Sequence, residues 1–246
     1  MGGTHSWRDN LVALLTPRRR RGIEYLDDPA VDARVVRRSL DDVARSNALF
    51  GGTRAVLAEL QLALRDIRRP IVTLLDVGTG AGDIPSRARA VAARMGIELV
   101  TIGIDGCEAL ARAAKSASLP MVRATALSLP VADHSVDIAL CSQVLHHFEH
   151  QDAIALLREL NRVARHRVIV SDLRRSWLAA AGIWLASFPL RFHPVSRHDG
   201  VVSVLRGFTG DELRHLVRVA VQQTPIVRNH LGFRTTAAWR PGEVHR

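Results

Sequence analysis

The sequence predicts an α/β fold of the Rossmann-like, doubly wound kind, with a mostly parallel sheet of seven strands and one antiparallel strand in a C-terminal hairpin. Three observations predict it. From residue 71 onward, short apolar runs alternate with segments of helical periodicity. The first apolar run leads into a glycine-rich turn, LLDVGTGAGD, at residues 74–83. The last two apolar runs lie so close together that only a hairpin can join them.

The alternation sets the topology of the sheet. A strand, a helix and a second strand in strict order form a right-handed crossover between parallel strands. Helices then cover both faces of the sheet, and the buried strands read as continuous apolar runs. We expect strands at 71–77, 98–105, 121–125, 136–142 and 167–172, and helices at 84–95, 107–117 and 151–164.

The end of the chain predicts one more helix and the hairpin. The helix is TGDELRHLVRVA, in which Thr209 and Glu212 have the spacing of a capping box. Two strands follow, PIVRNH and FRTTAAW, separated only by Leu231 and Gly232. Because so short a link permits no crossover, these two strands must be antiparallel.

Two segments lie outside the alternating pattern. Residues 1–69 read as a helical N-terminal extension, broken by the glycine pair at 51–52, and residues 70–246 as the main domain. In that domain the alternation stops between 173 and 208, which predicts an insertion. The apolar positions that indicate the main helix of the extension are Val31, Val35, Leu40, Val43 and Leu49.

Composition narrows the class of protein. A chain of 246 residues with 47% hydrophobic residues can form one ordinary domain with appended elements. The two cysteines, Cys107 and Cys141, have no metal-ligand spacing, so we expect no zinc site, no disulfide framework and a cytoplasmic location. We expect no signal peptide and no transmembrane segment, since the longest nearly uncharged stretch, 177–190, is shorter than the roughly 20 residues of a membrane span.

The net charge of +10 raises the alternative of a nucleic-acid partner. All but one of the 34 basic residues are arginine, and they are spread along the chain apart from the run at 18–21. Such a bias fits the codon usage of a GC-rich bacterial genome, so we expect no nucleic-acid substrate. The run at 18–21 is interpreted as a solvated turn, with contact to nucleic acid or an anionic membrane as the alternative.

The glycine-rich turn indicates the charge of the ligand. Its pattern is GxGxG, with Asp83 where a dinucleotide fingerprint has its last glycine and Asp76 just before the turn. A pyrophosphate at the helix N-terminus would be repelled by these carboxylates. A ligand that carries an ammonium and a sulfonium group would be attracted to them. S-adenosylmethionine is such a ligand.

Here the sequence resembles the class I S-adenosylmethionine-dependent methyltransferases, in particular small-molecule enzymes similar to those of ubiquinone and menaquinone biosynthesis. The resemblance covers about residues 70–172, through DVGTGAGD, IGIDGCEAL and LSLPVADHSVDIALCSQVLHHF. It implies that the first motif contacts the methionine portion of the cofactor. It also implies that Asp105 binds both ribose hydroxyls, a task that suits a carboxylate.

The resemblance implies a set of cofactor-binding residues. Many relatives place an acidic residue against the adenine amino group, and here that place holds Thr125, followed by Ala126 and Leu127. Ser142 and Gln143 should border the methionine end. The expected set is Asp76, Gly78, Thr79, Gly80, Gly82, Asp105, Gly106, Thr125, Ala126, Leu127, Ser142 and Gln143, with S-adenosylhomocysteine as the product and no metal.

His146 and His147 are the candidate catalytic residues. Histidine can take up a proton near neutral pH, so either could act as a general base. Neighbouring residues normally point to different faces of a helix or turn, so we expect one of the two to face the site. Methyl transfer can also depend mainly on alignment of donor and acceptor, in which case these histidines would have a structural role.

The insertion and the N-terminal extension are expected to form a lid and to supply the acceptor pocket, because such pockets combine apolar walls with a few polar groups. A hydrophobic dimer surface, or simple core packing, is the alternative for the aromatic residues of 173–208, and the chain could be a monomer or a homodimer. The expected substrate-binding residues are Tyr25, Phe50, Arg174, Trp177, Trp184, His198 and Arg206.

The predicted function is methylation of a small hydrophobic metabolite of bacterial natural-product metabolism, such as a phenol, enol, polyketide or quinone. Oxygen is the favoured acceptor atom, before carbon. An RNA methyltransferase is the first alternative, but the chain has no NPPY-like tetrad after the fourth strand. A scaffold subunit that binds the cofactor without catalysis is the second alternative, and Thr125 leaves it open.

Overall fold

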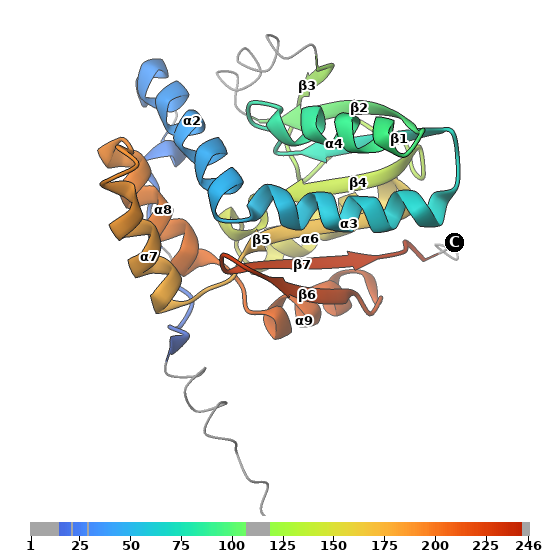
Figure 1. The fold of residues 1–246 in the computed structure, drawn as a ribbon. Helices are drawn as coiled ribbons and strands as arrows, with labels where there is room; N and C mark the ends of the chain where they lie inside the picture. The colour runs from blue at the N-terminus through green and yellow to red at the C-terminus, as the bar shows by residue number, and fades with distance from the viewer. Residues whose placement is uncertain (1–14, 21, 29, 107–118, 243–246) are drawn as a thin grey trace, which may run out of the picture.

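The computed structural model describes residues 15–20, 22–28, 30–106 and 119–242. The expected helix at 107–117 and Cys107 lie outside them. A seven-stranded sheet forms the centre of the protein, in the order β3-β2-β1-β4-β5-β7-β6 (Figure 1). The strands are β1 Ile71–Val77, β2 Glu98–Asp105, β3 Met121–Arg123, β4 Val136–Ser142, β5 Ala164–Leu173, β6 Ile226–His230 and β7 Arg234–Trp239.

The directions of the strands confirm the predicted topology. β1 pairs in parallel with both β2 and β4, β2 pairs in parallel with β3, and β4 with β5. β7 pairs antiparallel with β5 and with β6, so the C-terminal hairpin contributes the one antiparallel strand. That strand lies inside the sheet, and β6 forms the edge.

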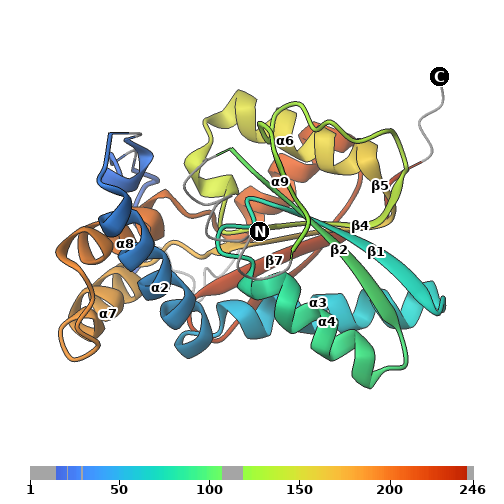
Figure 2. The ribbon, with the colours of Figure 1, turned by 90° about the horizontal axis from the view of Figure 1, so that it is seen from above.

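Helices cover both faces of the sheet, as Figure 2 shows with the sheet between them. On one face, α3 (Gly52–Ile67) and α4 (Asp83–Arg94) pack against the strands, and on the other α6 (His150–Val163) and α9 (Gly210–Val221) do so. α3 buries Val56, Leu60 and Leu64, one side of a helix at spacings of four residues. The capping box predicted for α9 is present, with Thr209 and Glu212 bonded to each other's backbone amides.

A second group of helices lies at the carboxyl ends of β1, β4 and β5 (Figure 1). It consists of η1 (Tyr25–Asp27), α2 (Ala33–Leu49), α7 (Trp177–Ser187) and α8 (Pro194–Arg206). Within the N-terminal segment, therefore, α3 belongs to a layer that covers the sheet, while η1 and α2 stand beside the insertion helices. α8 is the centre of this group, because η1, α2 and α7 all pack on it.

Polar contacts hold this group of helices together. The buried carboxylate of Asp42 on α2 accepts the backbone amide of His193 at 2.8 Å, and Asp199 on α8 accepts the amides of Tyr25 and Leu26 in η1. The apolar spacing predicted α2 correctly but named the wrong buried side. Val43 and Leu49 are 40% and 59% exposed, because the side that packs on the protein carries polar residues, namely Ser39, Asp42 and Asn47.

Candidate active site

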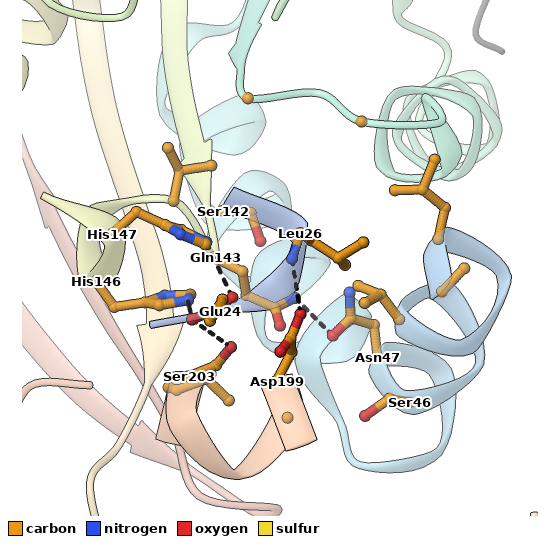
Figure 3. Close-up of a pocket in the computed structure, with 18 of the residues that line it drawn as sticks. Glu24, Leu26, Ser46, Asn47, Ser142, Gln143, His146, His147, Asp199 and Ser203 are labelled. Carbon is orange, nitrogen blue, oxygen red and sulfur yellow. Dashed lines mark hydrogen bonds and ion pairs between the residues drawn. The ribbon is translucent and has the colours of Figure 1, made fainter. Parts of the chain in front are cut away.

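A cavity of about 950 Å³ lies between the carboxyl ends of the strands and the second group of helices. The glycine-rich turn after β1 forms one wall, and residues of η1, α2, α7 and α8 form the other (Figure 3). This volume is at the upper end of the range for small-molecule sites. It leaves room for a cofactor and for a second molecule beside it.

The backbone of the glycine-rich turn approaches the cavity closely. Gly78 has φ +74°, and a Cβ atom there would collide with the side chain of Val144, so no other residue fits without strain. The amides of Gly78 and Thr79 both donate to the carbonyl of Ile104 at the end of β2. The Thr79 hydroxyl donates to Asp76 at 2.8 Å. These bonds fix the turn against the neighbouring strand and leave its outer side open to a ligand.

Asp76 is a buried acid beside other acids. Burial, reinforced by the charges of Asp83 and Asp105 and opposed by the hydrogen bond from Thr79, raises the pKa of Asp76 to about 7. Burial also raises the pKa of Asp83. Such a group is stabilised by a cationic ligand, and an anionic one would add to the repulsion. The electrostatics therefore support the cationic ligand expected from the sequence.

Unpartnered polar atoms gather at the cavity. In the described part of the chain, nine buried side-chain nitrogen and oxygen atoms have no hydrogen-bond partner, and five of them belong to residues that line this cavity. Buried polar groups are normally paired, so this cluster indicates a ligand that supplies the partners. The five atoms are Asp76 Oδ1, Asp83 Oδ2, Ser142 Oγ, His146 Nε2 and Arg234 Nε.

The remaining residues of the expected cofactor site are mostly brought together. Asp105, at the end of β2, accepts the Gly80 amide at 3.0 Å and borders the cavity. Thr125 also lines it, although its hydroxyl accepts the amide of Leu127 at 3.3 Å. Gly106, Ala126, Ser142 and Gln143 line it as well, whereas Gly82 and Leu127 do not.

His146 is oriented by a carboxylate that the sequence analysis did not single out. It follows β4 in the short helix η3 (Leu145–His147), and it is 3% exposed. Its Nδ1 lies 2.7 Å from Oδ1 of Asp172, and its backbone amide donates to Oδ2 of the same residue at 2.9 Å. Because a carboxylate only accepts, Nδ1 carries the proton, and in the neutral ring Nε2 is left as an acceptor. This Nε2 is one of the unpartnered atoms at the cavity.

Asp172 is suited to hold this ring. It is the residue before last in β5 and is fully buried. Burial by itself would raise its pKa, but the charge of His146 and the hydrogen bonds from His146 and the Leu173 amide outweigh burial, so the net effect lowers the pKa. The acid therefore stays ionised and keeps accepting from His146.

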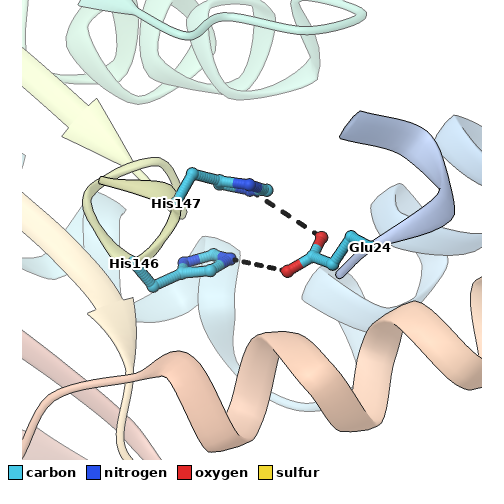
Figure 4. Close-up of side chains that lie close together, drawn as sticks. All are labelled: Glu24, His146 and His147. Carbon is cyan, nitrogen blue, oxygen red and sulfur yellow. Dashed lines mark ion pairs between the residues drawn. The ribbon is translucent and has the colours of Figure 1, made fainter. Parts of the chain in front are cut away.

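Both histidines face the cavity, which differs from the expectation that one of them would. Their ring centroids are 4.3 Å apart, and both Nε2 atoms point towards the carboxylate of Glu24, at 3.9 Å from His146 and 4.0 Å from His147 (Figure 4). His147 Nδ1 lies 3.1 Å from Asp27, and this bond, with the charges of Glu24 and Asp27, outweighs burial and raises the pKa of His147.

Glu24, His146 and His147 have ligand atoms within 4.8 Å of one another, an arrangement that could accommodate a divalent cation. The carboxylate of Glu24 is already compensated, however. Arg206 donates to its Oε1 at 3.0 Å, and Ser203 donates to the same atom at 2.9 Å. A cation would have to replace a guanidinium here, so we interpret the group as a hydrogen-bonded network, and the expectation of a site without metal stays a prediction.

A second network ties α2 to the sheet. Gln143, held at φ +57°, donates to Asn47 of α2 and accepts from Arg234 of β7 at 3.0 Å. Burial, opposed by the charge of Asp172, lowers the pKa of Arg234 to about 10. The network fixes the wall of the cavity next to the end of β4.

Most of the expected substrate residues do not line the cavity. Phe50 does, but the others lie elsewhere. The rings of Tyr25 and His198 contact each other, and the guanidinium of Arg174 lies over the ring of Phe233. Trp177 and Trp184 are half-exposed on α7, and Arg206 donates to Glu24, Asp27 and the Gly22 carbonyl. The residues that line it on this side were missed by the sequence analysis. They include Glu24, Leu40, Val43, Asn47, Ile183, Phe192 and Asp199.

Comparison with known proteins agrees with the fold and the turn. Residues 75–170 match the family described as a methyltransferase domain. A protein from Mycobacterium sp. strain JLS, described as an uncharacterized methyltransferase, is 39% identical over 135 residues, which are 55% of this chain and 51% of that protein. A similar protein from Mycobacterium sp. strain KMS is 37% identical over 135 residues, which cover the same fractions of the two chains. The chain thus spans about half the length of the curated relatives it matches.

Solved structures share the fold. The plantazolicin methyltransferase BamL, in complex with a desmethyl analogue and S-adenosylhomocysteine, matches with a TM-score of 0.59 and 15% identity, over 80% of this chain and 71% of that one. The magnesium protoporphyrin IX methyltransferase of Synechocystis PCC 6803, with bound S-adenosylhomocysteine, matches with a TM-score of 0.55 and 16% identity, over 81% and 87%.

The likeness to these solved structures shows a shared fold. The segment that matches the methyltransferase-domain family, residues 75–170, runs from β1 to β5 and includes the acid-flanked glycine turn.

Proposed function

We propose that the protein transfers a methyl group from S-adenosylmethionine to an oxygen atom of a small hydrophobic acceptor, such as a phenol, an enol, a polyketide or a quinone-like compound. One observation carries the proposal. The unpartnered Nε2 of His146, oriented by Asp172, opens into the same cavity as the acid-flanked glycine turn.

The turn side of the cavity would hold the cofactor. Its sulfonium and ammonium groups would compensate Asp76, and the two ribose hydroxyls would donate to Asp105. Thr125 and the neighbouring backbone would take the adenine. When bound, S-adenosylmethionine supplies an activated methyl group, so the protein has to align the acceptor with it and exclude water.

The opposite side would hold the acceptor. The side chains there are mainly apolar, including Leu40, Val43, Phe50, Ile183 and Phe192. Leu40 and Val43 of α2 both line the cavity. This lining favours a hydrophobic acceptor over a sugar or a nucleotide.

His146 would act as the general base. An acceptor hydroxyl at hydrogen-bond distance from Nε2 would lose its proton to that nitrogen as its oxygen takes the methyl group, the methyl–sulfur bond breaks and S-adenosylhomocysteine leaves, and Asp172 would stabilise the imidazolium.

The parts of the chain at the mouth of the cavity would act as its cover. These are η1 and α2 from the segment 1–69, and α7 and α8 from the insertion 173–208. Asp199 of α8 accepts two backbone amides of η1, so η1 and the insertion would move together.

The function is tested with labelled S-adenosylmethionine and a panel of phenolic, enolic and polyketide acceptors. We expect incorporation into at least one such acceptor and none into bulk RNA above the level of a Gly80→Arg control. Salt-sensitive labelling of RNA, with no labelling of the panel, would replace the small-molecule assignment with RNA methylation.

The cofactor role of Asp105 gives a separate prediction. Asp105→Asn is expected to weaken S-adenosylmethionine binding by about 1.5–3 kcal/mol, because it removes charge-assisted hydrogen bonds to the ribose. Calorimetry measures this loss. Asp211→Asn is the matched control, since that carboxylate is 93% exposed and pairs only with Arg214 on the surface of α9. Equal affinities of Asp105→Asn and the control would remove Asp105 from the site.

A further inference from the structure

We propose that the outer face of α7 binds the surface of an anionic lipid membrane. The face carries five exposed large apolar side chains at helical spacing, on two adjacent rows of the helix. Their exposed fractions run from 41% to 60%, and the residues are Trp177, Leu178, Trp184, Leu185 and Phe188, the last of which follows the helix directly.

The face is unpartnered because α7 is apolar on all sides. The segment Trp177–Ser187 contains no charged residue, yet within it only Ala179, Ala180 and Ser187 are buried. Those small residues lie on the side that packs on α8, and the large apolar residues point the other way. In Figures 1 and 2, α7 lies at the outer edge of the protein, away from the sheet. An apolar face of this kind marks an interaction site.

Arginines surround the face. The guanidinium of Arg20 lies 5.1 Å from the ring centroid of Trp177, and that of Arg197 lies 3.8 Å from the ring centroid of Phe188. Arg191 is exposed just beyond Phe188, and Arg38 of α2 donates to its carbonyl. Tryptophan rings with a cationic rim match the boundary between lipid headgroups and acyl chains, where basic side chains meet lipid phosphates.

The charge of the rim decides between a membrane and a second copy of the chain. A twofold dimer through α7 would bring the arginine rims of both copies together, whereas an anionic surface attracts them. α7 would lie in the plane of the membrane surface. Among the residues that the structure describes, no helix is both long and apolar enough to cross a bilayer.

The same helix also walls the cavity. Leu178 and Gly182 are exposed on the outside and line the cavity as well, and Ala179 and Ile183 line it from the inside. A membrane-bound α7 would therefore place the cavity beside the lipid phase. This consequence for acceptor delivery rests on the proposed function, but the lipid binding does not.

The test is sedimentation of the full chain with vesicles, without cofactor or acceptor. Vesicles of phosphatidylglycerol mixed with phosphatidylcholine should bind the protein at least about tenfold more strongly than phosphatidylcholine alone, and added salt should weaken the binding. The double variant Trp184→Gln, Leu185→Gln should reduce binding by about tenfold or more. Neither residue lines the cavity, and circular dichroism with thermal unfolding reports whether the variant is folded.

Val219→Gln is the matched control, because this residue is 42% exposed on α9, another helix of the protein. It should bind vesicles as the unchanged chain does. Two outcomes would overturn the proposal: no preference for anionic vesicles, or equal binding by the double variant. Self-association in sedimentation velocity that the double variant abolishes, without vesicle binding, would assign the face to a second copy of the chain.

Discussion

His146→Ala is expected to lower kcat by about 10²–10⁴-fold, the usual contribution of a general base, while leaving cofactor affinity within a few fold. The variant should affect kcat and not cofactor affinity because His146 lies apart from the residues expected to bind the cofactor. Nε2 of His146 points towards Glu24 beside η1, and the carboxylates expected to bind the cofactor lie at the ends of β1 and β2. Single-turnover kinetics with an identified acceptor measure the chemical step, and calorimetry measures the cofactor.

Two companion variants separate catalysis from structure. Asp172→Asn should lower kcat by at least about tenfold, because an amide can donate to Nδ1 and turn the ring to the wrong tautomer. His147→Gln should affect KM for the acceptor more than kcat, since this residue holds Asp27 and faces Glu24. Full turnover by His146→Ala would show that alignment of donor and acceptor suffices for transfer, and that His146 and Asp172 have a structural role.

Asp76→Asn is expected to stabilise the protein without cofactor while weakening S-adenosylmethionine binding at least about tenfold. The pKa of Asp76 is raised from 3.8 to about 7 in the folded state. A raised carboxyl pKa contributes stability that is present below pH 4 and is lost as pH rises through 7. At pH 8 the buried charge therefore destabilises the fold by up to about 4 kcal/mol, and asparagine removes that charge.

The free energy of unfolding of Asp76→Asn should rise by less than this 4 kcal/mol limit, by about 1–3 kcal/mol. The reason is that the asparagine amide leaves an unpaired donor in place of the unpartnered Oδ1. Thermal unfolding at pH 8 measures it, and the gain should shrink towards pH 5. In the unchanged protein, cofactor affinity should rise as pH rises through about 7, because the ionised acid binds the cation. An affinity that is independent of pH, and a variant with lowered stability, would contradict this account.

The strands and the place of the glycine turn at the cavity could be predicted from the sequence because their signals are local. Residues 136–142 are mostly apolar, with Asp137 and Ser142 as the exceptions, and the structure has a strand with those bounds, buried throughout. The glycine turn and Asp105 carry their chemistry within a few residues of a strand end. Asp172 could have been found by the same rule, since it also lies near the carboxyl end of a parallel strand.

The wall of the cavity opposite the glycine turn could not be predicted, because it is built from contacts between distant segments. Glu24 enters the site only through the bonds of η1 to Asp199, which no local pattern shows. Residue type is also a poor guide on α7. Trp177 and Trp184 are large aromatic residues of the kind that lines pockets, but on this helix the small residues face the protein and the large ones face outward. On α2, the side that packs on the protein carries polar residues, and the apolar Val43 and Leu49 are exposed, which is the reverse of what the apolar spacing predicted.

The central claim is that the acid-flanked turn binds S-adenosylmethionine, and isothermal titration of the full chain tests it most directly. We expect micromolar binding of S-adenosylmethionine and S-adenosylhomocysteine, with a proton released at pH 7 as the cationic cofactor drives Asp76 to its ionised form. Buffers of different ionisation enthalpy reveal that proton. Absence of heat with both compounds, together with binding of NAD, would show that the turn holds a pyrophosphate and that the account is wrong.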